Sequence, residues 1–200
     1  MLVTDDRLLG GRDPVDLATR AVRGGVTSVQ LRLKEASARE LADLATRLKQ
    51  ALSVPVLVND RPDVAAVAGC GVHLGPDDLP VELARRILPK GSIIGASVGG
   101  PAEAGRGEKA DFWGVGPWRV TGTKGDAGAA IGVAGFRKVV ALAKGKPCIA
   151  IGGVRPEDVP EILAAGGVGV AVVSGILGSD DVEAAARNYA VPRSPFRVPG

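Results

Sequence analysis

The sequence has little histidine, cysteine or aromatic side chain, and each shortage narrows what the protein can do. One histidine in 200 residues argues against a zinc site built from histidines and against a Ser-His-Asp hydrolase. Two cysteines, Cys70 and Cys148, each lie where an apolar strand begins, so we expect buried structural thiols and a reducing cytoplasm. Aromatic residues make up only 3% of the chain, which disfavours a sandwich built on bulky side chains.

Clusters of positive charge and long apolar runs are also missing. The net charge is +3 and the pI is near 9.1, but lysine and arginine are not concentrated in one segment or interleaved with aromatics. We therefore expect no nucleic-acid partner, whereas a modest positive field suits small phosphorylated substrates. No apolar run approaches membrane length and the opening MLVTDD carries no secretion signal, so we expect a soluble, cytoplasmic protein with no membrane partner. The sequence leaves open whether the protein forms a homo-oligomer.

Short apolar runs alternate with helical patterns along the whole chain. The expected strands are Leu2–Thr4, Ser28–Arg32, Val56–Asn59, Gly71–Leu74, Ile93–Ser97, Phe112–Val115, Cys148–Ile151 and Val168–Val173. Continuously apolar strands separated by helices indicate a parallel sheet covered on both faces, and eight such units predict an α/β fold, a single compact (β/α)8 TIM barrel. The alternative is an open doubly wound sheet, but no GxGxxG follows the first strand. We expect the barrel over residues 1–190 and a surface tail over 191–200.

Two helices carry clear start signals. Asp13 precedes the pattern Pro14–Arg23 as an N-cap, with proline at the first helical position. Ser37 precedes Ala38–Leu52, and Glu40 completes a capping box. Both predictions rest on local hydrogen bonding as well as on apolar spacing.

Acidic side chains follow the third and fourth expected strands. Asn59 and Asp60 end one strand, and Asp77 and Asp78 lie just beyond the next. Because the ends of successive parallel strands meet on one rim, Asp60 can converge with one of the later pair. Carboxylate and carboxamide oxygens suit Mg²⁺, which shares its remaining positions with water and substrate phosphates.

Cations and a carboxamide follow the second expected strand. Period-two spacing places Gln30, Arg32 and Lys34 on one side. Such a set suits a polyphosphate, which arginine grips bidentately and lysine neutralises. A solvated strand end is the alternative, but a carboxamide within an apolar strand favours function, since burying it without a partner is costly.

Glycine-rich loops follow the last three expected strands. The longest, Gly116–Gly128, holds two hydroxyls and a cation, Thr121, Thr123 and Lys124, which suit an anion unless the loop is merely mobile. Turns containing Gly152-Gly153 and Ser174 follow the seventh and eighth strands, where barrels frequently bind phosphate through backbone N–H groups. The strand ends thus predict two anion sites.

These motifs, in this order, resemble those of the thiamine phosphate synthase family, also called thiamine-phosphate pyrophosphorylase. The matching stretches are VTD at Val3–Asp5, VQLRLK at Val29–Lys34, VNDRPDVA at Val58–Ala65, GVHLGPDDLP at Gly71–Pro80, GASV at Gly95–Val98, VGP with TGTK within Val115–Lys124, AIGGV at Ala150–Val154 and GVAVVSGI at Gly169–Ile176. They cover nearly the whole chain.

The resemblance implies a transferase of thiamine biosynthesis. Members are (β/α)8 barrels that join a hydroxymethylpyrimidine diphosphate to a thiazole phosphate, releasing pyrophosphate by a dissociative mechanism with Mg²⁺ bound. It implies that Asp60 and Asp78 hold the metal. It implies the following further roles: diphosphate contacts from Gln30, Arg32, Lys34, Asn59 and Lys124; a pyrimidine contact from Ser97; a covering loop with Thr121 and Thr123; and thiazole-phosphate contacts from Gly152, Gly153, Val173 and Ser174. Arg32, Ser97 and Lys124 would take part in catalysis.

Several positions depart from the family pattern. Gly99 stands where members commonly have a histidine, Pro76 replaces a polar residue, and Trp118-Arg119-Val120 replaces an apolar–aromatic–proline run. The one histidine, His73, lies within an expected strand, where a structural hydrogen bond inside the barrel is favoured over acid–base work.

Three rival functions follow from these features. A thiazole tautomerase-like paralogue would rely on a histidine at the position of Gly99. A Schiff-base aldolase would use Lys34 or Lys124 as nucleophile, which requires a desolvated amine. A non-catalytic barrel that binds thiamine phosphates is the third, and the departures at Gly99 and Pro76 keep it open.

Overall fold

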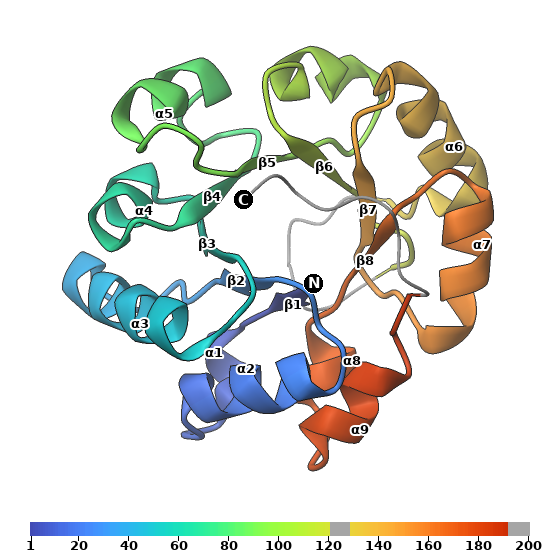
Figure 1. The fold of residues 1–200 in the computed structure, drawn as a ribbon. Helices are drawn as coiled ribbons and strands as arrows, with labels where there is room; N and C mark the ends of the chain where they lie inside the picture. Colours follow the sequence, from blue (N-terminus) through green and yellow to red (C-terminus); the bar gives the residue numbers. More distant parts are fainter. Residues whose placement is uncertain (121–128, 192–200) are drawn as a thin grey trace.

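The strands form one eight-stranded parallel sheet in sequence order, seen end on in Figure 1. The computed structural model describes residues 1–120 and 129–191. The strands are β1 (Leu2–Val3), β2 (Val29–Leu31), β3 (Val56–Asn59), β4 (Gly71–Leu74), β5 (Ile94–Ser97), β6 (Phe112–Val115), β7 (Cys148–Ile151) and β8 (Gly169–Ala171). A parallel bridge between Leu2 and Val172 joins the last strand to the first. The predicted (β/α)8 barrel is confirmed.

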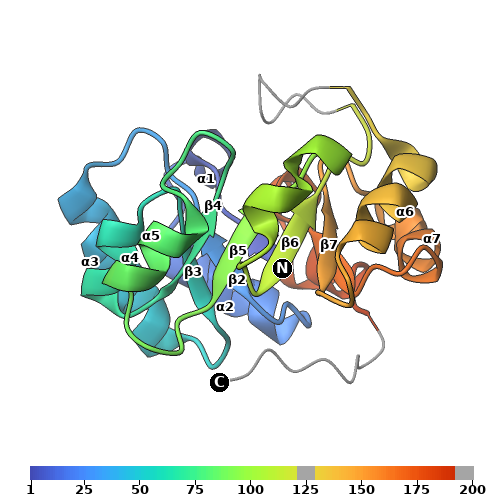
Figure 2. The ribbon, with the colours of Figure 1, turned by 90° about the horizontal axis from the view of Figure 1, so that it is seen from above.

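Helices surround the ring of strands and follow them in sequence (Figure 1). They are α1 (Asp6–Leu9), α2 (Pro14–Arg23), α3 (Ala38–Ala51), α4 (Pro62–Ala68), α5 (Val81–Ile87), α6 (Gly132–Leu142), α7 (Val159–Ala164), α8 (Ser174–Leu177) and α9 (Val182–Arg187), with 3₁₀ helices η1 (Pro101–Gly107) and η2 (Pro156–Asp158). In Figure 2, α3 to α5 cover one side of the strands, and α6 and α7 cover the other. Among the described residues, no helix is long and apolar enough to cross a membrane.

Both predicted helix starts are confirmed. The carboxylate of Asp13 accepts the Val15 N–H at 3.0 Å and opens α2. Ser37 and Glu40 form the expected capping box at the start of α3. Satisfying the first N–H groups in this way fixes where each helix begins.

Two strands are shorter than predicted because other groups take the hydrogen bonds at their ends. The sequence pattern extends the second strand to Arg32, but the Arg32 N–H donates to the hydroxyl of Thr4 at 2.8 Å, and β2 ends at Leu31. The sequence pattern extends the eighth strand to Val173, but Val173 forms the N-cap of α8 without a side-chain hydrogen bond, and its carbonyl oxygen accepts the Leu177 N–H. A side chain ends β2, whereas the start of a helix ends β8.

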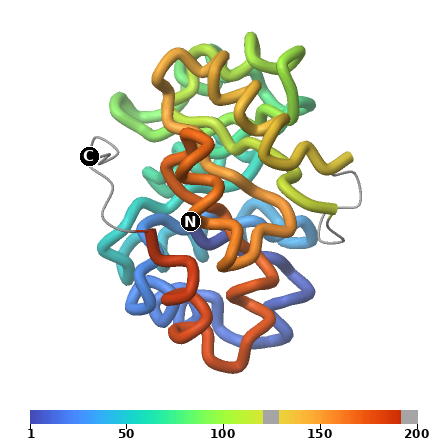
Figure 3. Tube along the Cα trace, turned by 90° about the vertical axis from the view of Figure 1, so that its right-hand side faces the viewer, coloured from blue at the N-terminus to red at the C-terminus, as the bar shows by residue number. Residues whose placement is uncertain are grey.

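The second and last α-helices, α2 and α9, lie side by side. Figures 1 and 3 place α9 next to α2, closing the helical layer where β8 meets β1. Gly24, at the end of α2, allows this approach, since a Cβ there would lie 2.4 Å from the carbonyl oxygen of Glu183. Residues 192–200, most of the predicted tail, lie outside the described residues.

The core is mostly aliphatic, and both cysteines belong to it. Cys70 and Cys148 are buried, 4% and 1% exposed, as predicted. Trp113 is also buried, and its indole N–H donates to the carbonyl oxygen of Gly107 at 2.7 Å. This bond fastens η1, a short segment that contains two glycines, to β6.

Candidate active site at the carboxyl ends of the strands

Two carboxamides meet where β2 and β3 end. Gln30 is 3% exposed, and its Nε2 donates to Oδ1 of Asn59 at 3.1 Å. Because the two strands are parallel neighbours, period-two spacing turns Gln30 and Asn59 to the same face. The structure therefore brings together two residues predicted to contact a diphosphate, and the buried carboxamide has the partner that its burial requires.

Arg32 leaves the end of β2 and is held by residues that follow β1. Its Nη1 lies 3.1 Å from Oδ2 of Asp5, and the two side chains are 13% and 12% exposed. Its backbone is held as well, since the Thr4 hydroxyl accepts the Arg32 N–H and donates to the Arg32 carbonyl oxygen at 3.2 Å. Asp5 also caps α1 by accepting the N–H groups of Arg7 and Leu8. One carboxylate thus joins the first helix to the cation.

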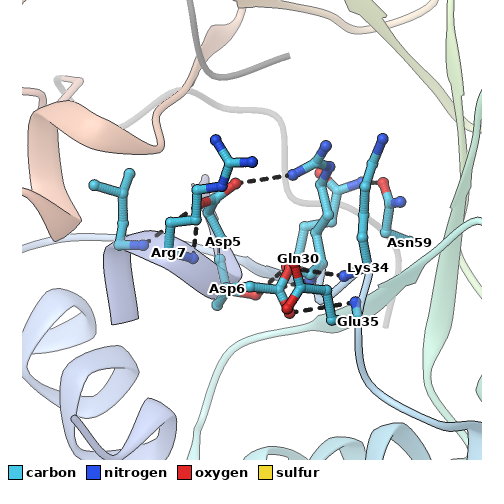
Figure 4. Close-up of polar contacts among 10 residues, drawn as sticks. Asp5, Asp6, Arg7, Gln30, Lys34, Glu35 and Asn59 are labelled. Carbon is cyan, nitrogen blue, oxygen red and sulfur yellow. Dashed lines mark hydrogen bonds and ion pairs between the residues drawn. The ribbon is translucent and has the colours of Figure 1, made fainter. Parts of the chain in front are cut away.

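Lys34 is held through its backbone by the next acidic residue. Oδ2 of Asp6 accepts the Lys34 N–H at 2.8 Å, and Oδ1 accepts the Glu35 N–H at 3.4 Å. Figure 4 shows Asp5 and Asp6 side by side, facing the strand end that carries Gln30 and Lys34. The acids that follow β1 therefore hold the guanidinium of Arg32 and the backbone of Lys34.

The two predicted metal ligands lie on neighbouring strand ends. Asp60 directly follows β3 in a left-handed conformation, with a φ of 64°, and its N–H donates to the carbonyl oxygen of His73 at 2.8 Å. After β4, Asp78 folds back so that its Oδ2 accepts the Gly75 N–H at 2.5 Å, whereas Asp77 is exposed. Residues 1–120 and 129–191 contain no group of three or more acidic, histidine or cysteine ligands for a metal. A pair of carboxylates still suits Mg²⁺, which takes one or two of them with substrate phosphates.

Ser97 ends β5 beside the buried histidine. Nε2 of His73 lies 3.0 Å from Oγ of Ser97, which confirms that His73 is hydrogen-bonded inside the barrel. Two glycines make room for the imidazole: a Cβ at Gly95 would lie 2.5 Å from its Nδ1, and one at Gly114 would lie 3.0 Å from its Cε1. The imidazole is therefore enclosed beneath Ser97.

The turn after β7 requires glycine twice. Gly152 and Gly153 have φ angles of 91° and 65°, which side chains with a Cβ rarely adopt. A Cβ at Gly152 would also lie 2.7 Å from Cβ of Pro117, and one at Gly153 would lie 2.9 Å from Cβ of Arg119. The Arg119 N–H donates to the Gly152 carbonyl oxygen at 2.9 Å. The turn is therefore packed directly against the residues that follow β6.

The turn after β8 leads into α8, a helix of four residues. Val173 forms its N-cap, and the Val173 carbonyl oxygen accepts the Leu177 N–H at 2.9 Å. The far end of α8 is held by Arg12, whose guanidinium donates to the carbonyl oxygens of Leu177 and Ser179. Val173 and Ser174 thus lie at the carboxyl end of the strand next to β7, as the sequence predicts.

Sequence reasoning did not assign a role to Asp5 or Asp6, or to the pair formed by Arg119 and Asp158. The Arg119 guanidinium contacts both carboxylate oxygens of Asp158, which is 3% exposed, and Nε lies 2.9 Å from Oδ2. Asp158 also accepts the Arg155 N–H at 2.9 Å. An acid directly after the first strand signals a rim position, but a pair separated by 39 residues leaves no local signal.

The sequence also singled out two other parts of the rim. Thr121, Thr123 and Lys124 lie outside the described residues. Gly99, where the resembling family commonly has histidine, donates its N–H to Oε2 of Glu103 at 2.9 Å. That backbone bond ties the departing chain to η1.

These features place the chain in a class. It is a parallel (β/α)8 barrel whose buried and half-buried polar side chains gather where the strands end, and in barrels of this class that face carries the active site.

The comparisons with known proteins agree on one family. A family model described as thiamine monophosphate synthase matches residues 1–176. Thiamine-phosphate synthase of Azorhizobium caulinodans is 47% identical over 195 residues, covering 93% of this chain and 90% of that protein. The enzyme of Moorella thermoacetica is 42% identical over 192 residues, covering 93% and 91%. The solved thiamine phosphate pyrophosphorylase from Pyrococcus furiosus superimposes with a TM-score of 0.84 at 37% identity, covering 94% of this chain and 92% of that structure. The chain belongs to the thiamine monophosphate synthase family.

Proposed function

We propose that the protein is a thiamine-phosphate synthase. It joins 4-amino-2-methyl-5-hydroxymethylpyrimidine diphosphate to 4-methyl-5-(2-phosphooxyethyl)thiazole, forming thiamine monophosphate and pyrophosphate. The observation that carries the proposal is the convergence of Gln30, Asn59 and the anchored Arg32 at adjacent strand ends of this family's barrel. These groups form a donor-rich seat of the kind that a diphosphate needs.

The leaving group dictates most of the chemistry. When the bond between the pyrimidine methylene and the diphosphate breaks, its electron pair leaves with pyrophosphate and a cation remains on the pyrimidine. Arg32 and Lys34 stabilise the negative charge that accumulates on the departing oxygens, and Lys124, which lies outside the described residues, would add a third cation. No covalent nucleophile on the protein is required, in keeping with one histidine in the sequence and no buried lysine in residues 1–120 and 129–191.

Magnesium would be held by Asp60 and Asp78. Both follow strands that are hydrogen-bonded neighbours, and both supply the hard oxygen ligands that Mg²⁺ prefers. When bound, the ion neutralises diphosphate charge. The two carboxylates also offset part of the positive charge of the nearby cations, so that charge alone does not hold pyrophosphate in the site.

The pyrimidine and the thiazole phosphate are assigned to the other strand ends. Ser97 contacts the pyrimidine, and His73 fixes the direction of its hydroxyl. The thiazole phosphate takes backbone N–H groups of the turn at Gly152 and Gly153, with the hydroxyl of Ser174 and the backbone of Val173 from the next strand end. This arrangement presents the thiazole nitrogen to the pyrimidine cation. We also infer a cytoplasmic location, in which both buried thiols stay reduced.

The test is a reconstitution. Purified protein is mixed with both phosphorylated substrates and Mg²⁺, and thiamine monophosphate and pyrophosphate are measured together by chromatography. Equal amounts of both products are expected. Ligand binding without any product would instead favour a tautomerase-like or a non-catalytic barrel. A protein that forms no thiamine monophosphate with Mg²⁺ present refutes the proposal.

A further inference from the structure

Asp5 makes two kinds of contact with its two carboxylate oxygens. Oδ1 accepts the N–H groups of Arg7 and Leu8, at 3.2 and 3.4 Å, and so caps α1. Oδ2 lies 3.1 Å from Nη1 of Arg32. The first contact is structural, whereas the second fixes the direction of a guanidinium that the proposed reaction uses. The two can therefore be separated by substitution.

The surroundings make this ion pair more restrictive than one on the surface. Asp5 and Arg32 are 12% and 13% exposed at their side chains, so solvent weakens their attraction far less than it does for an open pair. Thr4 holds the Arg32 backbone on both its N–H and its carbonyl oxygen. Arginine has five N–H donors, so a contact through Nη1 leaves others for a ligand.

We propose that Asp5 is a positioning residue. It orients Arg32, and Arg32 stabilises the leaving group while the bond breaks. The inference rests on the proposed function. Asp5 lowers the net positive charge of the seat, so it weakens the attraction for any bound diphosphate. By holding the guanidinium in one direction, it lets Arg32 meet the charge that develops as the bond breaks, which lowers the barrier without tighter binding of the ground state. Orientation and charge therefore act in opposite directions, and the kinetics can separate them.

Asp5→Asn is the informative variant. Asparagine keeps the oxygen that caps α1, and asparagine and aspartate are about equally good N-caps. It removes the negative charge facing Arg32 and places a donor there. Asp5→Ser, which also caps helices, is the second variant. The matched control is Asp13→Asn, because Asp13 likewise caps a helix, α2, and pairs with an arginine, Arg47 at 3.4 Å, but on the exposed helical layer.

The experiment measures kcat, KM for the pyrimidine diphosphate, and the Kd for inorganic pyrophosphate with Mg²⁺ by calorimetry. For Asp5→Asn and Asp5→Ser we expect kcat to fall at least about tenfold, as for a lost transition-state donor. The Kd for pyrophosphate should stay within about threefold of the unmodified protein or become tighter. Asp13→Asn should leave all three values within about twofold, and circular dichroism should show that each variant is folded.

Two results would overturn the inference. An unchanged kcat in a folded Asp5 variant would mean that Arg32 needs no positioning. If the Kd for pyrophosphate rises by the same factor by which kcat falls, Asp5 shapes ground-state binding instead. If the unmodified protein forms no thiamine monophosphate, the proposed function fails first, whereas an active protein with indifferent Asp5 variants refutes only the role of Asp5.

Discussion

Gln30 shows at the scale of one residue how the site is built into the barrel. It lies between Val29 and Leu31, which are fully buried, and is itself 3% exposed. A carboxamide in that position costs free energy unless it is hydrogen-bonded, and Asn59 on the next strand accepts a hydrogen bond from it. Binding groups of this kind are fixed by the same strands that form the fold, so they lose little freedom when a substrate arrives.

Replacing Gln30 with methionine should separate activity from stability. Methionine fills a similar volume without a donor, so we expect the free energy of unfolding to change by less than about 1.5 kcal/mol. Turnover should fall at least about tenfold, because the diphosphate loses a fixed donor. Denaturant unfolding and steady-state kinetics measure the two effects. A variant with full activity would remove Gln30 from the proposed seat.

The two candidate metal ligands give the next prediction. Asp60→Asn is preferable to alanine because asparagine tolerates the φ of 64° at this position. We expect Asp60→Asn and Asp78→Asn to lower turnover at saturating Mg²⁺ by at least about tenfold and to raise the Mg²⁺ concentration needed for half-maximal rate, since each removes a carboxylate ligand.

Asp77→Asn is the matched control for that experiment. Asp77 neighbours Asp78 but is exposed, so its substitution should leave the Mg²⁺ dependence unchanged. Were Asp77→Asn impaired and Asp78→Asn normal, the second ligand would be the other member of the pair.

At the scale of elements, loops from different strands hold one another in place. The segment after β6 lies on the Gly152–Gly153 turn, and Arg119 reaches from it to Asp158 in η2. Asp158 in turn accepts the N–H of Arg155 at the start of η2, so one carboxylate links the segment after β6 to the segment after β7. The proposed thiazole-phosphate turn is therefore supported from both sides.

The link through Asp158 should depend on pH. Its hydrogen bond with Arg119, together with the Arg155 N–H, holds the pKa of the Asp158 carboxyl below its usual value of 3.8. A carboxyl with a lowered pKa in the folded state stabilises the fold above its unfolded pKa and loses that contribution as pH falls through the folded pKa. We expect Asp158→Asn to be less stable than the unmodified protein at neutral pH, with a difference that narrows below about pH 4. Thermal unfolding between neutral and acid pH measures the difference, and a constant gap would contradict it.

The ends of the strands show which parts of the fold the sequence predicts and which it does not. β3, β4, β6 and β7 begin and end where the apolar runs predict, because their ladders are uninterrupted from end to end. The ends of β2 and β8 were misplaced by one or two residues, because Thr4 and the start of α8 compete for backbone groups there. Such competition depends on neighbours in space, which local patterns do not contain.

For the whole molecule, alternation and caps were sufficient to predict the barrel, but not the contacts that cross it. The repeat of strand and helix determines which strands are neighbours, and this placed Gln30 near Asn59. The pairs Asp5–Arg32 and Arg119–Asp158 join residues 27 and 39 positions apart, and side-chain geometry decides them. Candidate residues can thus be predicted from sequence, while the groups that orient them require the folded structure.

The two cysteines can report on the barrel as a whole. Cys70 precedes β4 and Cys148 begins β7, so they lie in different sectors of the ring (Figure 1). Burial raises the pKa of the Cys148 thiol to about 11 and also raises that of Cys70. Because the thiolate is the reactive form, a pKa higher by two units lowers its fraction about a hundredfold at mildly alkaline pH, and burial restricts access further. We expect neither thiol to react with a disulfide reagent in the native protein, and both to react in denaturant. Rapid labelling of Cys148 alone, followed by mass spectrometry of peptides, would show that the barrel opens beside β7 without unfolding elsewhere.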